Sequence, residues 1–375
     1  MSARRKILVV FGTRPEAIKL GPLITELRAR RELFDVHLCS TGQHRDLLVE
    51  PLAAFGLVPD TKLEVMREGQ SLARLLGRIL AELGPVLEAV RPDICVVQGD
   101  TSSAFGGALA AFYAQIPIAH VEAGLRSGDR SSPFPEEEHR ILIDSMARWC
   151  FAPTEEARNN LLAEGIDSER VWMTGNTGID ALRWLERQSL AHDAELDAYL
   201  DDHGVEPGDA LLVATIHRRE HPDHELANIA AALAEIAASP GVRVIAPVHP
   251  NPQVRATLDR CLHGSAVRRV PVLDPIRFCG LLRRATVVVT DSGGVQEEAT
   301  SLGVPSVIVR RRSDRPESVY VGLSRVVGCD RAAIVHATFN LLDSPQARRP
   351  CDVFGDGKAC ARIADVLGLG VPRMV

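Results

Sequence analysis

The sequence contains no long apolar run. No stretch approaches the roughly 18 consecutive apolar residues from which a membrane-spanning helix is inferred. The N-terminal "MSARRKILVVFGTRPE" has only a short apolar run after a brief basic lead, so it lacks the apolar core and cleavage site of a signal peptide. This start is typical of a first β-strand. We therefore expect a cytoplasmic protein that does not engage a membrane.

An excess of positive charge is also missing. Lysine and arginine number 43 against 49 aspartates and glutamates, which leaves a formal net charge of -6. This balance provides no general attraction to nucleic acid or to anionic membranes, so neither is expected as a partner. Any anionic ligand must be held by local groups.

Paired cysteines and a dinucleotide fingerprint are absent as well. The eight cysteines are scattered singly with no C-x-x-C pair, as expected for reduced thiols in the cytosol. No G-x-G-x-x-G follows a predicted strand, which disfavours a tightly bound nicotinamide. We therefore expect no cofactor.

What the chain does contain is an alternation of short Val- and Ile-rich runs with amphipathic stretches. Its 375 residues exceed the usual size of one core, which favours two domains. Such runs are typical of parallel, doubly covered sheets built from βαβ units. Six predicted strands in each half indicate an α/β protein of two Rossmann-like domains with parallel sheets. The strands are Lys6–Phe11, Phe34–Cys39, Ile94–Gln98, Ile116–Val121, Trp149–Ala152 and Val171–Thr174, then Leu211–Ile216, Val242–Val248, Val267–Leu273, Thr286–Thr290, Ser306–Val309 and Arg325–Val327.

The domain junction is expected in a long helical stretch. We predict an N-terminal domain over residues 1–178, a connecting helical linker over 179–208 and a C-terminal domain over 209–356. Residues 357–375 are too few for a domain. Their predicted helix is expected to pack back on the first domain.

Polar turns follow three predicted strands of the first half. Ligands of open α/β sheets bind beyond the carboxyl ends of the strands. Arg14 and Lys19 place positive charge at a helix start in "GTRPEAIK", with a salt-bridged turn as the alternative. Asp100, in "QGDTSS", is either an N-cap or a functional carboxylate. Glu122, in "HVEAG", is a poor cap residue and therefore the stronger functional candidate.

Histidines follow the first strand of the second half. His217 and His221 are four residues apart, a spacing seen in metal sites on helices. Arg218 stands where a zinc-protease motif needs glutamate, and Pro222 interrupts any helix through His221. No metal is therefore predicted, and an acid/base or phosphate role for His217 is favoured.

A glycine-rich turn and an arginine run complete the candidates. In "TDSGGVQEEA", Ser292, Gly293 and Gly294 are predicted to form a diphosphate cradle at a helix start, and Glu298 to bind ribose hydroxyls. The four arginines of "VIVRRRSDRPES" form either a solvated face or a phosphate contact.

The stretch "SPFPEEEHR" has two interpretations. Ser132 can cap a helix, Pro133 or Pro135 suits its first position, and acids favour its N-terminus. Alternatively, one of the glutamates is catalytic.

Taken together, these segments resemble one known family. The motifs "FGTRPEAIK", "GQHRDLL", "QGDTSS", "HVEAGLRSGD", "PFPEEEHR", "TGNTGIDAL", "HRRE", "PVHPNP", "TDSGGVQEEATSLGVP", "DRPE" and "GDGKA" resemble, in order, those of the non-hydrolysing UDP-N-acetylglucosamine 2-epimerases. The resemblance extends from about Lys6 to Leu367. It implies a glycosyltransferase-B-like fold with the active site in an interdomain cleft.

The resemblance also implies an activity and a set of residues. Such enzymes interconvert UDP-N-acetylglucosamine and UDP-N-acetylmannosamine for bacterial surface polysaccharides, without a cofactor and commonly as homodimers. The matching catalytic positions are Asp100, Glu122, Glu136 and His217. The matching UDP-binding positions are Arg14, Lys19, Phe278, Ser292, Gly293, Gly294, Glu298 and Arg315.

The chemistry explains why carboxylates on separate segments are needed. The C2 proton of the sugar is not next to a carbonyl, so its direct removal is not feasible. If UDP leaves C1, the developing positive charge acidifies C2–H, and proton loss forms a glycal. Re-addition of UDP and of a proton to the other face inverts C2, which requires diphosphate stabilisation and proton transfer on both faces.

The chain departs from the family pattern at several positions. His139 and His221 stand where the family usually has asparagine, Pro275 replaces a common tyrosine, and Arg310–Asp314 differs from "RDTTE". These changes are expected to lie near the pocket, so they bear on the sugar that is bound and not on the class of reaction.

A second nucleotide-sugar site is known in some bacterial members. Gln43, Glu136, Arg218 and His249 match that site, whereas Asp46 and Gly69 depart from it. We therefore expect weak or absent activation by substrate.

Three other functions remain as alternatives. A UDP-sugar glycosyltransferase would need an acceptor, a hydrolysing 2-epimerase would release free N-acetylmannosamine, and a UDP-sugar sensor would not need the carboxylates.

Overall fold

The computed structural model describes residues 4–130, 133–217, 221–248, 252–343 and 349–369. The chain divides into two compact units, and the division falls within helix α7 (Thr177–Ala191). Unit 1 comprises Met1–Arg183 and Gly355–Val375, and unit 2 comprises Trp184–Phe354.

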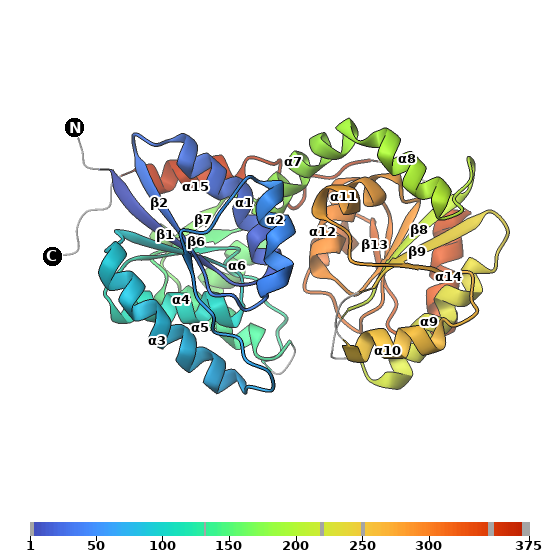
Figure 1. Cartoon of the computed structure of the whole chain (residues 1–375), viewed down its shortest axis with the longest axis horizontal. Coiled ribbons are helices and arrows are strands. Elements are labelled where there is room, and N and C mark those ends of the chain that lie inside the picture. Colours follow the sequence, from blue (N-terminus) through green and yellow to red (C-terminus); the bar gives the residue numbers. More distant parts are fainter. Residues whose placement is uncertain (1–3, 131–132, 218–220, 249–251, 344–348, 370–375) are drawn as a thin grey trace. The chain divides into compact units, whose positions relative to one another are not determined.

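Unit 1 is built on a parallel sheet of seven strands in the order β3-β2-β1-β4-β5-β6-β7 (Figure 1). The strands are rich in Val, Ile and Cys because both faces of the sheet are covered by helices. They are β1 (Arg5–Phe11), β2 (Phe34–Ser40), β3 (Thr61–Lys62), β4 (Ile94–Gln98), β5 (Ile118–Val121), β6 (Trp149–Ala152) and β7 (Val171–Met173).

The helices of unit 1 form a layer on each face of this sheet. One core joins alternate strand residues such as Leu8 and Val97 to helices including α3 and α4, and the other joins Ile7 and Val96 to α1 and α15. The helices and 3-10 turns are α1 (Arg14–Ala29), η1 (Arg45–Leu48), α2 (Val49–Ala54), α3 (Leu72–Val90), α4 (Ser102–Tyr113), α5 (Glu136–Met146), α6 (Glu155–Ala163), η2 (Ser168–Arg170) and α15 (Ala359–Gly368).

The two ends of unit 1 in the sequence lie side by side. Figure 1 shows α15, in red, beside the blue helix α1. Arg30 at the end of α1 forms an ion pair with Asp365, and both oxygens of Asp180 accept N–H groups at the start of α15, from Cys360 at 2.9 Å and Ala359 at 3.1 Å. The last helix is therefore part of the N-terminal unit.

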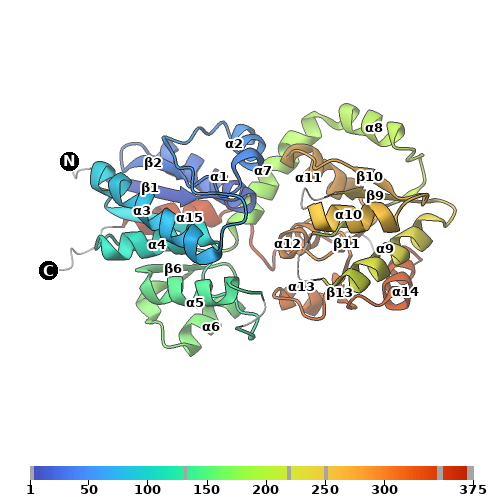
Figure 2. The same cartoon turned by 60° about the horizontal axis from the view of Figure 1, so that its bottom comes forward.

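Unit 2 repeats the same architecture with six parallel strands in the order β10-β9-β8-β11-β12-β13 (Figure 2). The strands are β8 (Ala210–Thr215), β9 (Val242–Pro247), β10 (Arg268–Val270), β11 (Val287–Thr290), β12 (Ser306–Ile308) and β13 (Ser324–Val326). Its helices are α8 (Asp193–Asp202), α9 (Asp223–Ala237), α10 (Pro252–Cys261), α11 (Pro275–Arg284), α12 (Gly293–Ser301), α13 (Pro316–Tyr320) and α14 (Arg331–Leu342). Helices α9, α10 and α14 share one core with the sheet.

The predicted fold class of two Rossmann-like α/β domains with parallel sheets is confirmed. Each predicted strand has a counterpart in the structure, but β3 was missed. It comprises only Thr61 and Lys62, which pair at the edge of the sheet and offer no apolar run. None of the helices described is long and apolar enough to cross a membrane.

Candidate active site

Each sheet has a point at which its strand order reverses. In unit 1 it lies between β1 and β4, and in unit 2 between β8 and β11. Ligands of open α/β sheets bind at such points, beyond the carboxyl ends of the strands. The turns that follow these four strands, and the one after β5, contain or lead directly into Arg14, Asp100, Glu122, His217 and Ser292–Gly294.

The turn after β1 is packed at Gly12 against the turn after β2 and the first residues of α4. A Cβ atom on Gly12 would lie 2.0 Å from Oγ of Ser103 and 2.1 Å from Oγ1 of Thr41. Ser103 in turn donates a hydrogen bond to Oε1 of Gln43 at 2.7 Å, and Arg14 begins α1 beside this turn. The turn therefore requires glycine, and it brings Arg14 and Gln43 to the same edge of unit 1.

Glu16, in the first turn of α1, joins the turns after β1 and β4. Its Oε2 accepts the N–H groups of Thr13 at 2.7 Å and Gly12 at 3.1 Å, and its Oε1 accepts the hydroxyl of Thr101 at 2.9 Å. Burial raises the pKa of Glu16 to about 7, although these hydrogen bonds oppose the shift. Glu16 thus fixes the local geometry from a buried position.

Asp100 follows β4 and is oriented by a buried arginine of α5. Thr101, rather than Asp100, caps α4 by accepting the N–H of Ala104 at 3.0 Å, so the N-cap interpretation of Asp100 is wrong. Both Nε and Nη2 of Arg140 lie 2.7 Å from Oδ2 of Asp100, and Nη1 lies 2.9 Å from Oε2 of Glu137. Arg140 is 5% and Glu137 2% exposed. One buried cation therefore positions both carboxylates.

His139 contacts the same turn from α5. Its Nδ1 lies 2.8 Å from the carbonyl oxygen of Asp100, and its ring stacks on Phe105 at 4.7 Å between centroids. Burial lowers the pKa of His139 despite the contacts with Asp100, so a neutral ring donates through Nδ1. The NH2 group of asparagine can donate in the same way, which accounts for this departure from the family pattern.

Glu122, after β5, is held by two partners in an uncommon backbone conformation. Its φ of 68° lies in the left-handed region, where a residue with a long side chain costs on the order of 1–3 kcal/mol. Nζ of Lys19 donates to its two oxygens at 2.7 and 2.6 Å, and Nε2 of Gln98 also donates to Oε2. The predicted UDP-binding Lys19 is thus paired with a predicted catalytic carboxylate.

The three acids of "PFPEEEHR" have different environments. Glu136 is the first residue of α5 and is half-buried, whereas Pro135 occupies the N-cap position. The expectation of a proline at the first helical position is therefore wrong. Glu137 is buried against Arg140, and Glu138 forms an ion pair with Arg130 at 3.2 Å. Of the three, Glu136 is the one at the first position of the helix, and Glu137 is the one that is buried.

In unit 2, a buried aspartate connects the two histidines that follow β8. Asp291 is fully buried at the end of β11 and accepts the N–H of His217 at 3.0 Å, while Nδ1 of His217 lies 3.0 Å from its Oδ1. Nε2 of His221 lies 3.3 Å from Oδ2 of the same residue. Burial lowers the pKa of His221, but its contacts with Asp291 and Cys329 outweigh this effect and raise the pKa to about 10.

The predicted diphosphate cradle opens helix α12. Ser292 is its N-cap, and Gly293 and Gly294 are its first residues, so their N–H groups belong to the first turn. A Cβ atom on Gly293 would lie 3.5 Å from Cζ of Arg315, which places the guanidinium beside the turn. Arg315 is 5% exposed and forms an ion pair with the buried Glu297. Helix dipole, glycine backbone and a held cation thus combine at one place.

The other arginines of the run have different surroundings. Arg311 is largely exposed and pairs with Glu225 at 2.7 Å, as expected of a solvated face, whereas Arg310 pairs with Asp314 at 2.9 Å. Phe278 in α11 and Glu298 in α12 are half-buried. The buried position of Arg315 sets it apart from Arg311.

Three residues singled out in the sequence lie outside the described residues. They are Ser132, Arg218 and His249. Of the predicted second nucleotide-sugar site, the structure therefore places only Gln43 and Glu136, both in unit 1.

The chain also has counterparts among known proteins. The family model described as UDP-N-acetylglucosamine 2-epimerase matches residues 26–368. This chain belongs to that family. Among relatives named UDP-N-acetylglucosamine 2-epimerase, the protein of Escherichia coli strain K12 is 42% identical over 373 residues, which cover 96% of this chain and 98% of that protein. The protein of Bacillus subtilis is 40% identical over 96% of this chain and 94% of its own length.

Solved structures of this family have the same fold. The UDP-GlcNAc 2-epimerase of Neisseria meningitidis, bound to UDP-GlcNAc, matches with a TM-score of 0.93 and 36% identity over 96% of this chain and 99% of that chain. The enzyme of Methanocaldococcus jannaschii, in complex with UDP-GlcNAc and UDP, matches with a TM-score of 0.88 and 34% identity over 97% and 100%. The expected glycosyltransferase-B-like class is thereby confirmed.

Against this family background, sequence reasoning missed several supporting residues. The capping pattern Thr13-x-x-Glu16 was a signal for Glu16, because glutamate at this spacing reaches back to the N-cap N–H. No comparable pattern marks the pairing of Arg140 with Asp100 or the position of Asp291 between two histidines. Both depend on contacts between segments far apart in the sequence.

Proposed function

We propose that this chain catalyses the reversible C2 epimerisation of UDP-N-acetylglucosamine to UDP-N-acetylmannosamine without releasing the free sugar. The observation that carries the proposal is the placement of Asp100, Glu122 and Glu136 on three separate segments of unit 1, the turns after β4 and β5 and the start of α5, in a chain of this family. Carboxylates of different elements can serve different faces of a sugar ring.

The proposed reaction proceeds through elimination and re-addition. The C1–O bond to UDP breaks, the C2 proton is transferred to a protein group, and a glycal with a C1–C2 double bond forms. UDP then returns to C1 while a proton is delivered to the opposite face of C2. Because the leaving group carries the developing negative charge, its stabilisation lowers the barrier to the first step.

The carboxylates of unit 1 are assigned to proton transfer. Asp100 is held by Arg140, and Glu122 is held by Lys19 and Gln98, so both are positioned before substrate binds. Glu136 begins α5 and is half-buried. Asp100, Glu122 and Glu136 together are assigned to the removal and return of the C2 proton.

The residues of unit 2 are assigned to the nucleotide. The N–H groups of Gly293 and Gly294 and the positive end of α12 suit the diphosphate, and Arg315 provides a cation beside them. His217, supported by Asp291, is assigned to the reacting end of the diphosphate. Phe278 and Glu298 are assigned to the uridine.

Finer parts of the proposal rest on the family resemblance. They are a homodimer, location in the cytoplasm, supply of bacterial surface polysaccharides, and weak activation at a second site formed by Gln43, Arg218 and His249. The proposed division of labour places catalytic carboxylates in residues 1–178 and UDP binding in 209–356, joined by 179–208, with 357–375 returning to the first domain. Light scattering after gel filtration tests the dimer.

Incubation of the purified protein with UDP-N-acetylglucosamine in deuterated water tests the reaction. The expected product is UDP-N-acetylmannosamine with deuterium at C2, detected by NMR without added metal or nicotinamide. Intact substrate without deuterium would refute the proposal. Free N-acetylmannosamine with UDP would instead identify a hydrolysing enzyme.

A further inference from the structure

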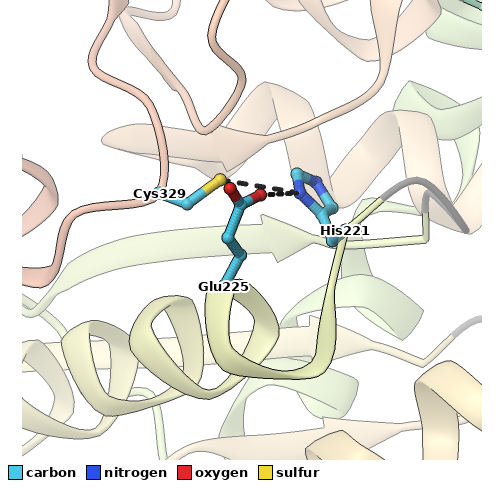
Figure 3. A group of neighbouring side chains, drawn as sticks. All are labelled: His221, Glu225 and Cys329. Carbon is cyan, nitrogen blue, oxygen red and sulfur yellow. Dashed lines mark hydrogen bonds and ion pairs between the residues drawn. The ribbon is translucent and has the colours of Figure 1, made fainter.

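Three side chains with metal-binding atoms converge in unit 2, and the proposed reaction uses none of them. His221 precedes α9, Glu225 lies in its first turn, and Cys329 follows β13 (Figure 3). Nδ1 of His221 lies 3.3 Å from Oε2 of Glu225 and 3.5 Å from Sγ of Cys329. A nitrogen, an oxygen and a sulfur thus face one another across a small gap.

The two separations from Nδ1 of His221 match edges of a coordination tetrahedron, and all three ligand atoms lie within 4.8 Å of one another. With Zn–N near 2.0–2.1 Å, Zn–O near 2.0 Å and Zn–S near 2.3 Å, tetrahedral angles place N and O about 3.3 Å apart and N and S about 3.5 Å apart. A direct N–H···O hydrogen bond is usually shorter, about 2.9–3.0 Å. The N···O distance is therefore long for a direct hydrogen bond, the N···S distance is ordinary for a contact with sulfur, and both suit a shared ion.

The surroundings also orient the ligands as in metal sites. The ring of His221 turns Nδ1 toward Glu225 and Cys329, while Nε2 lies 3.3 Å from Oδ2 of Asp291. Metal-bound histidines commonly donate their other ring N–H to a carboxylate, and here Nε2 lies within ion-pair distance of Asp291 without forming a hydrogen bond to it. The second oxygen of Glu225 accepts a hydrogen bond from Arg311 at 2.7 Å, which leaves Oε2 for the ion.

We propose that His221, Glu225 and Cys329 bind a divalent transition metal ion that accepts thiolate ligands, with Zn²⁺ as the expected ion. The side chains of His221 and Glu225 are 7% and 11% exposed, so the ion would be largely shielded from water. On binding, the metal replaces the proton on Nδ1 and the thiol proton, and both protons pass to solvent. The fourth position remains for a water molecule.

This site differs from the histidine pair that the sequence brought to attention. That pairing joined His221 to His217, whereas the structure turns Nδ1 of His221 toward Cys329, 108 residues away. His217 and His221 instead share Asp291, each through a different oxygen. Asp291 would therefore connect the metal ligand His221 to His217, the residue assigned to the diphosphate.

Titration of the metal-free full-length protein with Co²⁺ tests the site. Co²⁺ replaces Zn²⁺ in such sites, and a thiolate ligand produces a charge-transfer absorption in the near ultraviolet. One equivalent of this absorption is expected in the wild type and in Cys261→Ser, a matched variant of a part-buried cysteine in the same unit. It should be lost in Cys329→Ser.

Two further variants separate metal binding from folding. His221→Asn and Glu225→Gln should each weaken Zn²⁺ binding at least tenfold in competition with a chromophoric chelator. Zn²⁺ should raise the Tm of the wild type and of Cys261→Ser, but not that of His221→Asn. Equal Co²⁺ absorption in the wild type and Cys329→Ser, or an equal Tm shift in the wild type and His221→Asn, would overturn the proposal.

Discussion

Replacement of Arg140 by methionine should destabilise unit 1 markedly. Methionine fills a similar volume but removes the cation that contacts Asp100 twice at 2.7 Å and Glu137 at 2.9 Å. Removal of one partner from a buried ion pair costs about 3–5 kcal/mol, because an uncompensated charge stays buried. Glu137 keeps the N–H groups of Ser127 and Gly128, and the side chain of Asp100 is 23% exposed. Both facts favour the lower end of this range, so Arg140→Met should lower the free energy of unfolding by about 3 kcal/mol.

Urea unfolding followed by circular dichroism measures this loss. The double variant Arg140→Met/Glu137→Gln supplies the internal control, since removal of the second buried charge should restore at least about 1 kcal/mol, as expected for residues in contact. Arg140→Lys keeps the positive charge but loses the planar, forked arrangement of N–H donors. Its free energy of unfolding should therefore lie between those of the wild type and Arg140→Met. A loss below about 1 kcal/mol in Arg140→Met, or no recovery in the double variant, would refute the reasoning that the arginine compensates the buried carboxylate of Glu137 and the partly exposed one of Asp100.

Four other predictions concern activity, packing and pH. Glu136→Gln should retain UDP binding by calorimetry and lose at least about a hundredfold in kcat, the lower range of acid–base contributions; an unchanged kcat would remove Glu136 from proton transfer. Gly12→Ala should lower both the Tm and kcat, since its Cβ would lie 2.0 Å from Oγ of Ser103 and clash with it. An unchanged Tm would show that the turn can shift to accommodate the methyl group. The pKa of Glu16 is raised from 4.5 to about 7, so the folded protein binds this proton more tightly than the unfolded chain does. The free energy of unfolding should therefore fall as the pH rises from 4.5 to about 7. Relative to the wild type, Glu16→Gln should therefore gain up to about 3 kcal/mol between pH 5 and pH 8, and a pH-independent difference in urea unfolding would contradict this. Arg315→Lys should weaken UDP binding about tenfold, because lysine lacks the planar guanidinium that can pair with Glu297 and still donate to a phosphate. An unchanged affinity by calorimetry would show that the phosphates bind elsewhere.

The sequence contained enough local information to predict the architecture. Runs such as Ile94–Gln98 and Val287–Thr290 are apolar on both faces, and this property alone identifies buried parallel strands. The edge strand at Thr61–Lys62 was missed because its pairing follows from its neighbour rather than from its composition. Strand ends then directed attention to Asp100, Glu122 and the turn at Ser292.

The limits of prediction appear in the partners of those residues. Local pattern could not decide between N-cap and functional carboxylate for Asp100, and the decision came from Thr101 capping α4 and from Arg140 arriving on another helix. The departures His139 and His221 also had no account in sequence. In the structure, His139 contacts the carbonyl oxygen of Asp100, and His221 lies between Asp291 and Cys329, so each histidine has partners that explain its position.

The sequence by itself determined the strands, the helix starts, the glycine turns and the family, because all of these depend on residues close together along the chain. Only the tertiary structure decided which charges compensate one another. The partners of Asp100, Glu122 and His221 lie 40, 103 and 108 residues away, on Arg140, Lys19 and Cys329. Packing of separate elements on one sheet brings such groups together, and the spacing of residues along the chain does not encode that packing locally.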